Sequence, residues 1–160
     1  MKALLVVDVQ NDFLPYGALA VPEGDTIIPT VNTLMQHFDI VVASQDWHPA
    51  DHSSFASQHT GQQPGTVIDI EGTPQILWPD HCVQHCSGAS FASGLDVHRF
   101  DYVVRKGDDR RVDSYSAFFD NDHVKSTGLE QWLRDHDVDE VVVCGLAADY
   151  CVKFTVLDAL

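Results

Sequence analysis

Four short apolar runs constrain the fold of this chain more than any other feature. They are rich in β-branched residues and cover residues 3–8, 39–46, 101–106 and 139–145. None of them alternates apolar and polar side chains. Such runs are typical of strands that are covered on both faces, as in a parallel sheet.

Segments with apolar residues at helical spacing lie among these runs, at residues 25–38, 126–137 and 152–160. In the first segment, Asp25 or Thr26 would cap a helix, and Pro29 fits its first turn. The order of strands and helices predicts an α/β fold, in which a doubly wound, Rossmann-like parallel sheet carries helices on both faces.

The length of 160 residues fits one domain, and no linker or internal repeat divides residues 1–160. Residues 47–100 show no regular pattern apart from a short helix expected near 88–95. A connection this long in a compact domain is usually functional or disordered. Its aromatic and proline residues favour a packed, ordered excursion.

Composition excludes some partners. The formal net charge is −15, from 24 acidic residues against nine Lys and Arg, which disfavours nucleic acid and anionic membranes. No stretch approaches the roughly 18 apolar residues of a membrane span, and Asp8 interrupts the apolar N-terminus, which therefore fits a strand better than a signal peptide. We expect a cytoplasmic protein in which the four cysteines, at positions 82, 86, 144 and 151, are free thiols and Cys144 belongs to the core.

Reactive side chains follow the predicted strands. Asp8, Asp46 and Lys106 end the first three runs, and Cys151 follows the fourth within a short loop. Ligands bind beyond the carboxyl ends of strands in open parallel sheets. We therefore expect these four side chains to lie together.

Cys151 is the candidate nucleophile of this group. At the start of a helix, the dipole and free N–H groups would favour its thiolate and stabilise an oxyanion, and Lys106 would lower the thiol pKa further. Asp8 could take the thiol proton and later deliver it to a leaving amine. The alternative is that Cys151 is a small buried hydrophobe.

Six stretches together resemble the nicotinamidases of the isochorismatase-like cysteine hydrolases. They are VVDVQNDF (6–13), SQDWHPADHSSF (44–55), WPDHCV (78–83), RKG (105–107), YSAF (115–118) and GLAADYCV (145–152). The resemblance implies hydrolysis of nicotinamide, and also of pyrazinamide, through a thioester, as a step of NAD salvage.

The same resemblance implies roles for individual residues. Asp8, Lys106 and Cys151 would form the catalytic triad. The Leu146–Ala147 peptide would be cis, and the N–H groups of Ala147 and Cys151 would form the oxyanion hole. The walls of the pocket around a pyridine ring would be Phe13, Trp78 and Tyr115.

A metal site is also implied, with Asp46, His48 and His81 as ligands of one divalent ion, zinc first, with iron or manganese as alternatives. Asp46 and His48 point the same way if this stretch is extended, and Pro49 biases His48 toward that conformation. Such a donor set leaves positions for water and substrate. The resemblance does not decide whether His52 is a fourth ligand. In some family members a histidine here completes the metal shell, and in others the residue is polar and contacts the metal through water.

Two departures from the family pattern stand out. Ala148 replaces the usual threonine, and the chain stops at Leu160 where family members continue, so we expect a C-terminal strand and helix to be missing. Alternatives are a metal-free relative, such as an isochorismatase or an N-carbamoyl amide hydrolase, and a non-catalytic, flavodoxin-like binding module. A homo-oligomer that binds a small-molecule substrate is the expected assembly.

Overall fold

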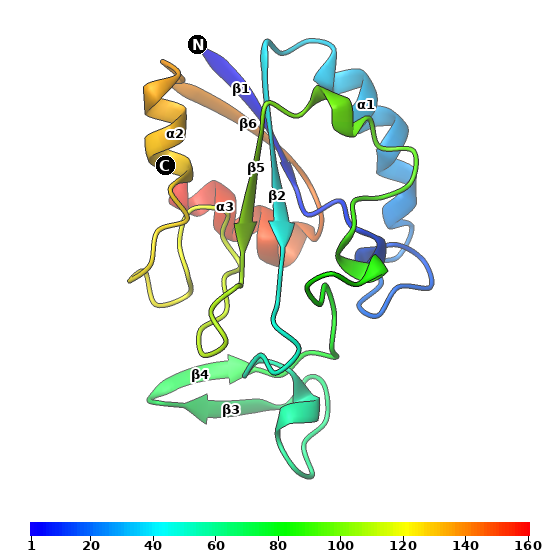
Figure 1. Ribbon diagram of the computed structural model, residues 1–160, viewed down its shortest axis with the longest axis vertical. Coiled ribbons are helices and arrows are strands. Elements are labelled where there is room, and N and C mark those ends of the chain that lie inside the picture. Colours follow the sequence, from blue (N-terminus) through cyan, green and yellow to red (C-terminus); the bar gives the residue numbers. More distant parts are fainter.

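A four-stranded parallel sheet forms the centre of the protein, whose 160 residues are all described by a computed structural model (Figure 1). Its strand order is β5-β2-β1-β6. The strands are β1 (Lys2–Val7), β2 (Ile40–Asp46), β5 (Tyr102–Lys106) and β6 (Glu140–Gly145). The chain leaves β1 toward one side of the sheet and later returns to its other side with β6, which confirms the doubly wound α/β prediction.

Both faces of β1 are buried, and successive residues serve opposite faces. Leu4 and Val6 pack with Val31 and Met35 of α1 (Ile28–Met35). Leu5 and Val7 belong instead to a second core cluster that includes α2 (Leu129–Asp135) and Cys151. This double burial explains why the strand carries no polar alternation.

The helices are shorter than the sequence pattern predicts. α1 follows a 3₁₀ turn, Gly24–Ile27, so Asp25 and Thr26 lie inside that turn, and the prediction that one of them caps α1 is wrong. Pro29 does occupy the first turn. α3 (Lys153–Asp158) follows a wide helical turn, Ala148–Val152. No helix of this chain is long and apolar enough to cross a bilayer.

The excursion after β2 is packed and partly regular. It contains the antiparallel hairpin of β3 (Val67–Ile70) and β4 (Thr73–Ile76), which projects beyond the carboxyl ends of the sheet strands (Figure 1). The short helix expected near residues 88–95 is wrong, since only a 3₁₀ turn, Ser87–Ala89, forms there. Glycine and serine are weak helix formers, and the Ala92 N–H bonds the Val9 carbonyl instead.

The four cysteines are free, as predicted. Cys144 is half-buried against the core cluster on the α1 face, and burial raises its pKa to about 11. A thiol in that setting stays protonated at neutral pH and serves as core packing.

Candidate active site

Four reactive side chains meet at the carboxyl edge of the sheet around Lys106. The ammonium Nζ lies 2.8 Å from Asp8 Oδ2 and 2.6 Å from Asp46 Oδ1. It also donates to the Ser114 carbonyl at 2.9 Å and lies 3.5 Å from Cys151 Sγ. All four titratable side chains are buried.

The strand register explains this meeting. Asp46 and Lys106 are paired residues at the ends of neighbouring strands β2 and β5. Asp8 has a positive φ of 48°, which turns the chain away from β1 directly after the strand. Ser44 Oγ donates to Asp8 Oδ1 at 2.7 Å and holds the turned carboxylate beside β2.

Burial and charge set the protonation of the two carboxyl groups. Burial opposes the charged form of Asp46, but Lys106 and then His48 outweigh it, so the pKa of Asp46 lies well below its usual value. Burial raises the pKa of Asp8, and although Lys106 lowers it, Asp46 raises it again. Asp46 is therefore a permanent anion, whereas Asp8 is the carboxyl group that can exchange a proton.

Burial also raises the pKa of the Cys151 thiol well above its usual value, and Lys106 offsets this only in part because Asp8 and Asp46 oppose it. Lys106 lowers this pKa, as expected, but burial outweighs its effect and the net shift is upward. Cys151 sits in the wide turn Ala148–Val152, and the charge of Lys106 is shared with two carboxyl groups. The resting thiol therefore needs a base, and Asp8 is the adjacent group that can act as one.

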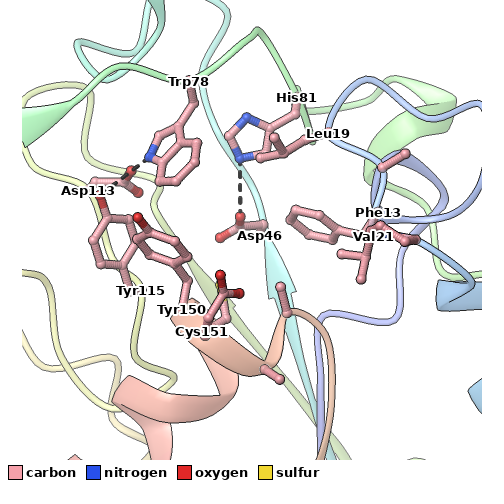
Figure 2. A pocket seen from close by; sticks show the side chains of 15 residues that line it. Phe13, Leu19, Val21, Asp46, Trp78, His81, Asp113, Tyr115, Tyr150 and Cys151 are labelled. Atoms are coloured by element: carbon pink, nitrogen blue, oxygen red, sulfur yellow. Dashed lines mark hydrogen bonds and ion pairs between the residues drawn. The ribbon is translucent and has the colours of Figure 1, made fainter. Parts of the chain in front are cut away.

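A second cluster shares Asp46. Candidate ligand atoms of Asp46, His48 and His81 all lie within 4.8 Å of one another. Asp46 Oδ2 is 3.3 Å from His48 Nε2. It is also 3.6 Å from His81 Nε2, a contact that Figure 2 shows.

Backbone carbonyls fix both imidazole rings in a form that can bind a metal. His48 Nδ1 donates to the Gly107 carbonyl at 2.9 Å, and His81 Nδ1 donates to the Pro79 carbonyl at 2.7 Å. Because a carbonyl only accepts, each Nδ1 carries a hydrogen, and in the neutral form of each ring Nε2 keeps its lone pair. His48 Nε2 is buried without a hydrogen-bond partner. A divalent metal ion fits this unsatisfied nitrogen and the carboxylate beside it.

Only glycine fits at position 107. A Cβ there would collide with the His48 ring, and the φ of +68° disfavours other residues. The RKG stretch therefore serves both clusters, since its lysine lies between the carboxylates and its glycine carbonyl orients His48.

His52 lies beside His48, with ring centroids 4.5 Å apart. Its Nδ1 accepts the Ser54 backbone N–H at 3.1 Å and lies 2.8 Å from Ser54 Oγ. Because Nδ1 accepts, the hydrogen of the neutral ring is on Nε2. His52 Nε2 is buried without a partner.

A cavity of about 340 Å³ opens over Cys151 (Figure 2). The three predicted wall residues, Phe13, Trp78 and Tyr115, all line it. Tyr115 Oη accepts hydrogen bonds from Trp78 Nε1 at 3.3 Å and from Gln75 Nε2 at 3.0 Å. Ten of the 15 lining residues are hydrophobic, so the cavity suits a small, flat, apolar ring.

Other lining residues were not predicted. Tyr150 stands edge-on to Trp78, with ring centroids 4.8 Å apart. Leu19 and Val21 close the side next to Phe13, and Asp113 is a buried carboxylate in the wall. An aromatic residue directly before the candidate nucleophile was a usable signal for Tyr150, whereas the aliphatic pair carries no chemical signature.

The two residues expected to form an oxyanion hole, Ala147 and Cys151, both line the cavity. The Leu146–Ala147 peptide bond is cis, as the resemblance implies. Ala147 and Ala148 both line the cavity, and the Ala147 N–H makes no hydrogen bond to another backbone group. It is therefore free to donate into the cavity.

The isochorismatase domain family matches residues 2–160. The nicotinamidase of Escherichia coli is 55% identical to this chain, over 99% of the chain and 76% of that protein. The chain belongs to the nicotinamidases of the isochorismatase family.

Solved structures of other family members share the fold. The yeast nicotinamidase Pnc1p bound to the inhibitor nicotinaldehyde matches with a TM-score of 0.93 at 34% identity, covering 99% of this chain and 81% of that one. A pyrazinamidase of Pyrococcus horikoshii in complex with zinc matches with a TM-score of 0.78 at 38% identity, covering 99% and 77%. This family member therefore has relatives with a pyridine-based inhibitor and with zinc.

Proposed function

We propose that this family member hydrolyses nicotinamide to nicotinate and ammonia through a thioester on Cys151. The observation that carries the proposal is the contact of Lys106 with Asp8, Asp46 and Cys151 beneath an aromatic cavity. Relatives named nicotinamidases, with up to 55% identity, support the substrate.

Asp8 takes the proton of the Cys151 thiol, and the thiolate attacks the carboxamide carbon. Lys106 remains charged and stabilises the thiolate. The oxyanion of the tetrahedral intermediate accepts from the N–H groups of Ala147 and Cys151. Asp8 then delivers its proton to the leaving nitrogen, so that ammonia departs and the thioester remains.

Water completes the reaction by attacking the thioester carbon. Asp8, again unprotonated, takes a proton from this water, and the tetrahedral intermediate collapses to nicotinate and the Cys151 thiol. One carboxyl group thus acts as base and acid in both halves, which suits the raised pKa of Asp8.

Asp46, His48 and His81 would hold one divalent metal, with zinc as the first choice. One carboxylate and two imidazoles suit zinc, iron or manganese, and the zinc complex of the Pyrococcus relative supports zinc. When bound, the metal supplies a coordination position for the pyridine nitrogen, which orients the ring in the cavity.

His52 is not a direct ligand in this proposal. Its Nδ1 lone pair is used by the Ser54 N–H, and its Nε2 carries the hydrogen. A neutral ring in this form donates from Nε2 and has no lone pair there for a metal. It is suited to donate to a water near the metal.

Phe13, Trp78 and Tyr115 would enclose the pyridine ring, and their apolar faces also suit pyrazinamide, which differs from nicotinamide by one ring nitrogen. The fixed Tyr115 hydroxyl and the Trp78 indole hold the wall rigid. Assembly into a homo-oligomer and a cytoplasmic location stay predictions, which light scattering and cell fractionation test.

An ammonia-release assay on nicotinamide tests the function. The wild-type protein is expected to release ammonia, and Cys151→Ala is expected to lose on the order of 10³-fold or more in kcat. Cys86→Ala is the matched control, because Cys86 is exposed and lies outside the cavity. Full activity of Cys151→Ala would overturn the thioester mechanism. Faster hydrolysis of an N-carbamoyl amide than of nicotinamide would favour the metal-free relative.

A further inference from the structure

The end of β2 lacks a strand neighbour on one side. Backbone pairing between β1 and β2 stops at Val7 and Ser44, and the Asp8 N–H makes the last bond, to the Ser44 carbonyl. Asp46 lies two residues further along β2. On its other side it is paired with Lys106, and the Trp47 N–H bonds the Lys106 carbonyl.

The side chain of Gln10 occupies the place of the missing strand. Its Oε1 accepts the Asp46 backbone N–H at 2.8 Å, and its Nε2 donates to the Asp46 carbonyl at 2.8 Å. The second hydrogen of Nε2 goes to the Ala89 carbonyl at 2.9 Å. Gln10 is completely buried, so water cannot replace any of these bonds. Its amide reproduces the donor and acceptor of a neighbouring peptide group.

Asp46, whose backbone Gln10 holds, belongs both to the Lys106 cluster and to the histidine cluster. Asp46 Oδ1 contacts Lys106, and Asp46 Oδ2 faces His48 and His81. Two carboxylate oxygens that serve two different partners tolerate little rotation or displacement. A backbone held on both edges supplies that restraint, on one edge by β5 and on the other by Gln10.

We propose that Gln10 is a positioning residue, which fixes the Asp46 carboxylate for the metal and for Lys106. It lies outside the lining of the cavity, and the hydrogen bonds of its side chain go to the backbone of Asp46 and Ala89. The proposal rests on the metal site of the proposed function. It does not depend on which amide is hydrolysed.

Gln45 provides a matched control one residue from Asp46. It is the same residue type, is also buried, and also donates to the Ala89 carbonyl at 2.9 Å. Its Oε1 accepts from Arg105 Nε at 3.3 Å, and it makes no bond to the backbone of Asp46. Replacing Gln45 therefore removes a buried amide and the Ala89 bond but leaves the bonds of Gln10 to Asp46 intact.

The experiment compares Gln10→Met with Gln45→Met. Zinc affinity is measured by competition with a chromophoric chelator, and stability is measured by urea unfolding of the zinc-free proteins. Methionine keeps the length of the side chain and removes its polar atoms. We expect Gln10→Met to weaken zinc binding by roughly 10–100-fold, as is typical when the support of a ligand is removed. Gln45→Met is expected to keep a zinc affinity within about threefold of wild type, and its unfolding free energy shows how much a lost buried amide costs without a change to the Asp46 backbone contacts.

A second variant, Gln10→Asn, keeps an amide that is too short to span both Asp46 groups, and it serves if Gln10→Met does not fold. It is expected to lose zinc affinity in the same direction. A folded Gln10 variant that binds zinc as tightly as Gln45→Met overturns the positioning role. A loss of affinity that Gln45→Met shares equally also overturns it, because the effect then reflects general destabilisation.

Ammonia release by the wild-type protein is measured alongside and separates the two hypotheses. If the wild-type protein binds zinc and only Gln10 variants bind it weakly, but nicotinamide is not hydrolysed, the positioning role stands and the proposed substrate fails. If nicotinamide is hydrolysed and the Gln10 and Gln45 variants bind zinc alike, the function stands and the positioning role fails.

Discussion

Replacing Lys106 with methionine is the most direct test of the buried charge cluster. Lys106 is only 1% exposed, and its ammonium group contacts both Asp8 and Asp46. Methionine fills much of the same volume and removes the charge. The two carboxyl groups would then share a buried site from which the ammonium group is missing. Removing one partner of a buried ion pair costs about 3–5 kcal/mol, because the remaining charge cannot be solvated.

The loss should depend on pH in a defined direction. In the wild-type protein the pKa of Asp46 is depressed, so Asp46 contributes stability above its unfolded pKa of about 3.9, and this is lost as pH falls through the folded pKa. Without Lys106, the largest remaining influence on Asp46 is burial, which raises its pKa. The variant then gains stability relative to wild type as pH falls, since protonation removes the buried charge.

The assay is urea unfolding of the metal-free proteins at two pH values. One, about pH 7.5, lies well above the usual carboxyl pKa range, and the other, about pH 5.5, lies closer to it. The free-energy difference between wild type and Lys106→Met should be about 3–5 kcal/mol at the higher pH and smaller at the lower pH. Lys125→Met is the control, since Lys125 forms an exposed pair with Asp108 at 2.8 Å and should cost no more than about 1 kcal/mol. Equal losses for both variants, or a loss for Lys106→Met that grows as pH falls, would refute the reasoning.

Three further outcomes are expected. The pKa of His48 is raised to about 9, because Asp46 outweighs the lowering effect of burial. A metal that binds His48 must displace the proton of this imidazolium. Zinc affinity, measured by chelator competition, should therefore rise with pH up to about 9 and level off above it. Tyr115→Phe removes the acceptor of the Trp78 indole, and steady-state kinetics should show a KM for nicotinamide raised several-fold and kcat changed little. A large fall in kcat would contradict a role in holding the pocket wall alone. Leu129→Ala removes a fully buried side chain at the start of α2. Urea unfolding should show a loss of roughly 2–5 kcal/mol, and zinc affinity should be unchanged.

The sheet could be predicted because burial on both faces leaves a clear trace in a short strand. Leu4 and Leu5 must both be apolar when one faces α1 and the other faces α2. The helix boundaries were less accurate, since local turns compete for the same residues. Asp25 looked like a cap from its type alone, but the chain continues a 3₁₀ turn through that position.

The meeting of Asp8, Asp46 and Lys106 could also be predicted, because parallel strands present their carboxyl ends at one edge of a sheet. The role of Gln10 could not. Its partners are backbone atoms of residues 46 and 89. The sequence around Gln10 does not indicate that the end of β2 lacks a neighbouring strand. Asp113 was missed for a similar reason, since its place in the cavity wall depends on how distant loops fold together.

The thiol pKa shows where local reasoning fails. From sequence, Cys151 has one adjacent cation and the start of a helix, and both favour the thiolate. In the fold, the same cation also serves Asp8 and Asp46, and all of these groups are buried. The charge of Lys106 is shared among Asp8, Asp46 and the sulfur, so Lys106 lowers the thiol pKa by less than burial raises it.

That charge balance connects the two clusters. Asp46 belongs to both, with one oxygen toward Lys106 and the other toward His48 and His81. Positive charge held on the histidine side would attract the Asp46 carboxylate and leave more of the Lys106 charge for the sulfur. In the proposed mechanism the shared carboxylate would therefore link the charge at the histidines to the charge that Lys106 presents to the sulfur. It also explains why Asp46 needs a fixed backbone, since a shift toward either partner would weaken its contact with the other.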